Sequence, residues 1–146
     1  AALSLNVPYV IFDEPVLGLD ANHRELFYDL LLKDYENSER TIIIATHLIE
    51  EVANIIEEVV LIVKGKVLLQ DNVSSLLETG YSVSGLAHEV DAYCADKNVI
   101  GYDELGNLKI AYVMGEKTPL PKMGNLSFST MNLQKLFVKL TEKGGN

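Results

Sequence analysis

Cysteine and long apolar runs are what this sequence has least of. Cys94 is the single cysteine among 146 residues, so a framework of internal disulfides is excluded and a reducing cytosol is favoured. No apolar run approaches the roughly 18 residues that a membrane-spanning helix needs. With 48% hydrophobic residues, the chain can nevertheless form a globular core. We therefore expect a soluble, folded chain without a membrane span or a targeting segment.

Basic residues are also scarce, and the deficit is confined to one part of the chain. Residues 1–79 carry 14 acidic and 5 basic side chains, whereas residues 80–146 carry 7 of each, which gives the whole chain a net charge of -9. This asymmetry predicts two parts. Nucleic acid is not an expected partner, because phosphate backbones attract clustered Lys and Arg. A phosphate ligand near the acidic part would need metal ions beside it.

Residues 9–15 (YVIFDEP) form an apolar run that ends in two carboxylates and a proline. An apolar run without polar alternation is typical of a central strand in a parallel sheet, with both faces covered. Ligands of such sheets bind just beyond the carboxyl ends of the strands, where Asp13 and Glu14 fall. An isolated Asp-Glu pair is more often a plain polar turn, but the preceding strand favours a site.

The next segments predict a βαβ unit. Asp20 is a good N-cap for a helix, and residues 41–45 (TIIIA) read as a second buried strand. A helix between two such strands makes a right-handed parallel unit. Thr46 and His47 follow the second strand, and we expect His47 beside Glu14 at the same edge of the sheet. A lone histidine at a helix start is more often structural. The apolar residues that recur at helical spacing are Leu26, Phe27, Leu30 and Leu31.

Shorter elements follow in the second half of the chain. Residues 59–69 read as a hairpin around Lys64-Gly65-Lys66, and residues 72–79 as a short helix that Gly80 ends. From Tyr81 the pattern predicts strands at 81–83, 99–102, 108–113 and 126–129, helices at 86–96 and 132–142, and a loop at 115–125. We place a boundary between an α/β part, residues 1–79, and a small α+β accessory module, residues 80–146.

Three motifs in a fixed order resemble the ATP-binding-cassette (ABC) ATPases. Residues 10–15 (VIFDEP) resemble the family's Walker B strand, residues 18–20 (GLD) its D-loop, and residues 44–47 (IATH) its H-loop. The hairpin that follows is also similar to one in the family. The resemblance covers residues 1–79 and implies the C-terminal half of a nucleotide-binding domain. The expected fold class is α/β, with a partial P-loop NTPase parallel sheet and flanking helices.

The resemblance also implies a role for each site residue. Asp13 would coordinate Mg²⁺, and Glu14 would be the general base for the hydrolytic water on ATP. His47 would sense the γ-phosphate, and Asp20 would reach across a nucleotide-sandwich dimer. Val16 replaces a threonine that many members carry, which puts no catalytic role in doubt. The implied partners are a transmembrane permease subunit and a second nucleotide-binding subunit, at the cytoplasmic face of the cell membrane.

The C-terminal residues suggest a subfamily. Residues 132–141 (NLQKLFVKLT) are similar to the ending of ATPase subunits from bacterial exporters, with Gln134 in place of the usual acid. This implies ATP hydrolysis that drives export, with a regulatory or dimer-supporting module. A plain amphipathic helix that packs on the module fits the same residues. Two alternatives stay open: a non-transport ABC-class ATPase in DNA repair or translation, and a non-catalytic binding module.

Three of the family's motifs are absent from this sequence: a G-x-x-x-x-G-K-[ST] phosphate loop, the L-S-G-G signature and the Q-loop. The chain also begins without methionine, and we expect a fragment. Two carboxylates and a histidine cannot replace a cradle of backbone N–H groups and a lysine. We therefore expect negligible ATP affinity and no activity for this chain alone. A missing neighbouring strand would leave an apolar sheet edge or force the later hairpin to close the gap, so we also expect self-association or rearranged strand pairing.

Overall fold

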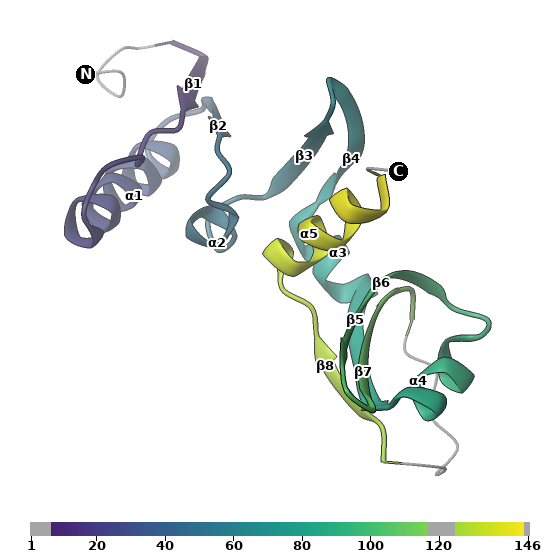
Figure 1. Ribbon diagram of the computed structural model, residues 1–146. Coiled ribbons are helices and arrows are strands. Elements are labelled where there is room, and N and C mark those ends of the chain that lie inside the picture. Colours follow the sequence, from purple (N-terminus) through teal and green to yellow (C-terminus); the bar gives the residue numbers. More distant parts are fainter. Residues whose placement is uncertain (1–6, 117–124, 145–146) are drawn as a thin grey trace. The chain divides into compact units, whose positions relative to one another are not determined.

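The computed structural model describes residues 7–116 and 125–144 of the chain (Figure 1). It separates into two compact units, residues 1–49 and residues 50–146. Most of the expected loop at 115–125, and the expected helix end at 1–5, lie outside the described residues. Within the described ranges, no helix is both long enough and apolar enough to cross a membrane.

The first unit is a βαβ unit, as the sequence predicts. It consists of β1 (Tyr9–Asp13), α1 (Ala21–Glu36) and β2 (Thr41–Ala45), and the two strands pair in parallel. Asp13, the last residue of β1, lies opposite Ala45, the last residue of β2. The carboxyl ends of both strands therefore meet at one edge of the sheet.

One face of this small sheet is covered and the other is open. The ring of Phe12 packs edge-on against Phe27 of α1, with 5.4 Å between ring centroids. On the other face, Tyr9 and Ile11 are each 68% exposed and Ile43 is 47% exposed. The prediction of a strand covered on both faces is therefore wrong for the described chain. Helix α1, the one long helix that the structure describes in this unit, covers only one face of the sheet.

The second unit begins with the predicted hairpin. Its elements are α2 (Ile49–Val52), β3 (Glu58–Val63), β4 (Lys66–Asn72) and α3 (Val73–Thr79), and β3 pairs antiparallel with β4. Lys64 and Gly65 both have positive φ, 50° and 75°, as a tight two-residue turn requires. Asn72 caps α3 by accepting a hydrogen bond from the Ser74 backbone. Gly80 ends α3, with a φ of -100°, and begins the next strand.

A four-stranded antiparallel sheet follows, in the order β6-β7-β5-β8. Its strands are β5 (Gly80–Leu86), β6 (Asn98–Leu105), β7 (Leu108–Met114) and β8 (Ser127–Thr130), and its helices are α4 (Ala87–Cys94) and α5 (Leu133–Gly144). The core of this part is Tyr81, Val83, Val90, Cys94, Ala111 and Val113. The predicted elements are present, with bounds that differ by a few residues.

The predicted boundary after residue 79 falls inside the second compact unit, where α3 leads directly into β5. Helix α5 contacts β6, and it also contacts β3 and α3 on the other side of that boundary. The division into 1–79 and 80–146 stays a prediction. As a whole, the mixed α/β fold is consistent with a partial P-loop NTPase sheet followed by a small α+β module.

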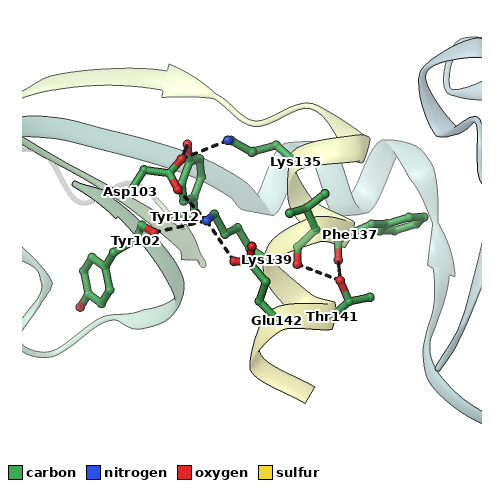
Figure 2. A network of polar contacts seen from close by, with 9 residues as sticks. Tyr102, Asp103, Tyr112, Lys135, Phe137, Lys139, Thr141 and Glu142 are labelled. Atoms are coloured by element: carbon green, nitrogen blue, oxygen red, sulfur yellow. Dashed lines mark hydrogen bonds and ion pairs between the residues drawn. The ribbon is translucent and has the colours of Figure 1, made fainter. Parts of the chain in front are cut away.

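A polar network fixes α5 on the sheet (Figure 2). Lys139 is buried, and its ammonium lies 2.7 Å from Oδ1 of Asp103. The other carboxylate oxygen of Asp103 accepts hydrogen bonds from the Tyr112 hydroxyl at 2.8 Å and from Lys135 at 3.0 Å. Lys139, Tyr112 and Lys135 together hold the pKa of the Asp103 carboxyl well below its usual range. The apolar side chains of this amphipathic helix complete the contact, since Leu133, Leu136 and Phe137 are buried.

Candidate functional site

Glu14 leaves the end of β1 with an unusual backbone conformation. Its φ is +45°, a left-handed value that costs a residue other than glycine about 1–3 kcal/mol. The neighbouring strand holds this conformation, because the Glu14 backbone N–H donates to the carbonyl oxygen of Ala45 at 2.8 Å. Strain of this kind is concentrated at functional sites in proteins.

The side chain of Glu14 meets the residues that follow β2. Its Oε1 lies 2.6 Å from Nδ1 of His47 and accepts a hydrogen bond from the His47 backbone N–H at 3.1 Å. Its Oε2 accepts a hydrogen bond from the Thr46 hydroxyl at 2.9 Å. An ionised carboxylate can only accept, so Nδ1 carries the hydrogen of the contact with Oε1. The juxtaposition of Glu14 and His47 that the strand pattern predicts is thus present.

These contacts keep Glu14 ionised. The hydrogen bond from His47 lowers the pKa of the Glu14 carboxyl most, and the hydrogen bond from Thr46 lowers it further, while partial burial opposes both. The contact with His47 is an ion pair only when the imidazole is protonated. The side chain of His47 is 65% exposed and that of Glu14 is 29% exposed. The pair therefore offers a carboxylate base beside an imidazole that solvent and ligands can reach.

Thr46 is the site residue whose role the sequence did not indicate. Its hydroxyl oxygen accepts a hydrogen bond from the Leu48 backbone N–H at 3.0 Å while its hydrogen goes to Glu14. A threonine that precedes a helix start commonly makes such a local turn. The available signal was a hydroxyl residue at the end of β2, but nothing in the sequence showed that its partner lies 32 residues earlier.

Asp13 lies at the same edge of the sheet as this pair. It is exposed, and no group of three or more His, Cys, Asp or Glu side chains in the described part of the chain is arranged to hold a metal ion. Mg²⁺ typically binds through one or two protein carboxylates together with waters and substrate phosphates. The exposed carboxylate of Asp13 fits the role of one such ligand, and its assignment to Mg²⁺ stays a prediction.

Asp20 has a structural role that the sequence predicted and a functional role that stays a prediction. Its carboxylate caps α1 by accepting a hydrogen bond from the His23 backbone N–H at 3.0 Å, and Nδ1 of His23 lies 2.8 Å from Oδ2. The backbone hydrogen bond from His23 is the main reason that the pKa of the Asp20 carboxyl is lowered. Gly18 makes the preceding turn with a φ of +82°. Within the described residues, the contacts of Asp20 lie at the start of its own helix, and none is with Glu14 or His47.

No protein-family model matches the chain. Its relatives among characterised proteins include the energy-coupling factor transporter ATP-binding protein EcfA2 of Bacillus thuringiensis (strain Al Hakam), at 28% identity over 99% of this chain and 44% of that protein. The EcfA2 proteins of Mycoplasmoides gallisepticum and Acetivibrio thermocellus are 38% and 29% identical over 45% and 52% of this chain, and these matches cover 20% and 27% of those proteins.

The chain spans less than half the length of these relatives. This similarity supports the resemblance, seen in the motifs, to the C-terminal portion of an ABC-type ATPase. Their names refer to energy-coupling factor transporters and do not support the exporter subtype.

Proposed function

We propose that this chain is the C-terminal portion of the ATP-hydrolysing subunit of an ABC transporter. The observation that carries the proposal is the Glu14–His47 pair, with 2.6 Å between Oε1 and Nδ1, at the adjoining ends of two parallel strands. A carboxylate and an imidazole at that edge are suited to activate a water and to contact a phosphate. The similarity to transporter ATP-binding proteins supports the same function.

Each site residue then has a distinct task. The Glu14 carboxylate accepts the proton of the water that attacks the γ-phosphate of ATP. His47 contacts the γ-phosphate through Nε2, the ring nitrogen that Glu14 does not engage. Donation through both ring nitrogens requires the protonated imidazolium. Asp13 would hold Mg²⁺, whose positive charge would offset that of the phosphates. Asp20 would contact the second nucleotide-binding subunit.

The phosphates need groups that this chain does not contain. A phosphate loop provides backbone N–H donors and a lysine, and no such motif occurs in the 146 residues. Residues 1–79, with 14 acidic and 5 basic side chains, repel a nucleotide rather than attract it. We therefore infer that ATP binding and hydrolysis need the remainder of a longer parent protein, and that this chain alone is inactive.

The names of the relatives favour an energy-coupling factor transporter over an exporter as the parent complex. The exporter subtype rests on the sequence of α5 alone, and α5 has a sufficient structural role in packing on β6. Either subtype places the parent at the cytoplasmic face of a membrane, with a transmembrane permease and a second nucleotide-binding subunit as partners. Co-purification of the parent with a membrane protein tests this placement against a role in DNA repair or translation.

Hydrolysis of ATP by the full-length parent tests the catalytic proposal. The Glu14→Gln variant should lose roughly 100-fold or more in kcat, because general-base catalysis contributes about 10²–10⁴-fold. Glu25→Gln is the matched control, since Glu25 is an exposed residue of α1, and it should stay within about twofold of the wild type. Equal activity of Glu14→Gln and the control would reject the proposal in favour of a binding module.

A further inference from the structure

The carboxylate of Glu14 is held by three donors in the described structure. Oε1 receives the backbone N–H and the Nδ1 hydrogen of His47, and Oε2 receives the hydroxyl of Thr46. A carboxylate has about four lone-pair positions for hydrogen bonds. The donors therefore fill both positions on Oε1 and one on Oε2, which leaves one position on Oε2 to receive a proton.

The hydroxyl of Thr46 is oriented by a second hydrogen bond, which it accepts from the backbone of Leu48. A threonine hydroxyl offers one hydrogen and two acceptor positions. The Leu48 backbone N–H occupies an acceptor position at 3.0 Å, so the single hydrogen is free to point to Glu14 at 2.9 Å. Thr46 is also partly buried, whereas the side chain of His47 is 65% exposed. Of the two side chains that hold Glu14, Thr46 is the more constrained.

We propose that Thr46 is a positioning residue that keeps the Glu14 carboxylate aligned when His47 moves toward a phosphate. This inference rests on the proposed function, in which the imidazole of His47 contacts the γ-phosphate. A ring that shifts toward a ligand lengthens its 2.6 Å contact with Oε1. The hydrogen bond from Thr46 to Oε2 does not depend on the ring, and it fixes which lone pair of Glu14 faces an attacking water.

Steady-state ATP hydrolysis by the full-length parent distinguishes a positioning role of Thr46 from a role in forming the turn alone. Thr46→Val keeps the shape of the side chain and removes the hydroxyl, and we expect kcat to fall roughly 10-fold with little change in KM for ATP. Thr46→Ser restores the hydroxyl and should return kcat to within about twofold of the wild type. Thr41→Val is the matched control, because Thr41 lies at the opposite end of β2 and is exposed.

A double variant tests whether Thr46 acts through Glu14. In the Glu14→Gln background, Thr46→Val should cause no further loss, because two residues that act as a unit are not additive. A merely structural role for Thr46 would give the same fractional loss in both backgrounds, and that additivity would overturn the inference. Wild-type kcat for Thr46→Val would overturn it as well. If Glu14→Gln itself has no effect, the proposed function fails instead.

The 146-residue chain supplies a second readout that needs no hydrolysis. Carbon relaxation of the Glu14 side-chain methylenes measured by NMR reports picosecond-to-nanosecond order. Thr46→Val should lower this order and Thr46→Ser should preserve it, each compared with Thr41→Val. Unchanged order in Thr46→Val would show that Thr46 does not hold the carboxylate, and would overturn the inference whatever the parent hydrolyses.

Discussion

A β-carbon added at Gly101 of β6 would lie 2.7 Å from Cδ of Lys139 on α5. The missing side chain makes room for the aliphatic stem of this lysine, whose side chain is only 6% exposed. The ammonium at the end of the stem then reaches the carboxylate of Asp103 at 2.7 Å. One glycine and one ion pair thus fix the position of the last helix on the sheet.

Gly101→Ala should therefore destabilise the chain by about 1–3 kcal/mol, the usual cost of overpacking a filled site. Chemical denaturation at neutral pH measures this change in the free energy of unfolding. The double variant with Lys139→Ala is the control, because truncating the lysine removes the clash and should reduce the cost of the alanine. An equal cost in both backgrounds would mean that Lys139 is not what limits the space at Gly101.

Asp103→Asn should destabilise the chain by about 2 kcal/mol, because it leaves the buried ammonium of Lys139 with weaker partners. The value lies below the range for fully buried pairs, since the side chain of Asp103 is 41% exposed and Glu142 still contacts Lys139 at 3.0 Å. Asp96→Asn is the control: the side chain of Asp96 is 77% exposed beside Lys97, and its loss should leave the free energy of unfolding nearly unchanged.

The contribution of Asp103 should also depend on pH. Its pKa is lower in the folded chain than its unfolded value of about 3.9, because Lys139, Tyr112 and Lys135 stabilise the ionised form. The stabilisation is therefore complete above about pH 4 to 5 and is lost as the pH falls below the unfolded pKa toward the folded one. The difference between the wild type and Asp103→Asn should be constant from pH 7 to pH 5 and smaller at pH 3. A difference that grows on acidification would contradict this sign.

Millimolar ATP with Mg²⁺ should leave the melting temperature of the 146-residue chain within about 1 °C of its value without nucleotide. A ligand stabilises a protein only when its concentration approaches or exceeds Kd, and the chain has no phosphate loop. The same concentration of ADP with Mg²⁺ and of MgCl₂ alone provides the controls. A shift of several degrees that is specific to ATP would show that Asp13, Glu14 and His47 bind the nucleotide without the missing loop.

We expect the chain to self-associate through the open face and edges of the β1–β2 sheet. Ile11 is 68% exposed and Ile43 is 47% exposed, and unpaired strand edges invite further pairing. Light scattering should give a mass above that of one chain, and Ile11→Lys should lower it. Leu105→Lys, at a residue of β6 that is 80% exposed, is the matched control and should have little effect. A strictly monomeric wild type would contradict the expectation.

The sequence predicted the elements well because their signals are local. The N-cap at Asp20 and the turn at Gly65 each act over a few residues, and each is found in the structure. The apolar face predicted for α1 is only partly buried: Leu31 is buried, whereas Leu26 and Leu30 are 56% and 49% exposed. The meeting of Glu14 and His47 also followed, since parallel strands must end at one edge. The left-handed backbone of Glu14 could not be predicted, because glutamate shows no preference for that conformation.

Two other features depend on contacts between distant residues. An apolar run indicates a strand but does not reveal what covers it, so the exposure of Ile11 was not foreseen. A lysine on an amphipathic helix is expected at the surface. Lys139 is buried because Asp103, 36 residues earlier, neutralises it.

The thin core of the βαβ unit has a consequence for the order in which the chain unfolds. Its buried apolar side chains among the described residues are Val10, Val16, Tyr28 and Leu31, whereas the second unit buries a much larger set. Regions with few buried apolar contacts open at lower free energy than the rest of a protein. Amide hydrogens of β1 and β2 should therefore exchange sooner than those of β5 and β7. A protease should therefore cut first within the βαβ unit, which is the unit that carries Glu14 and His47.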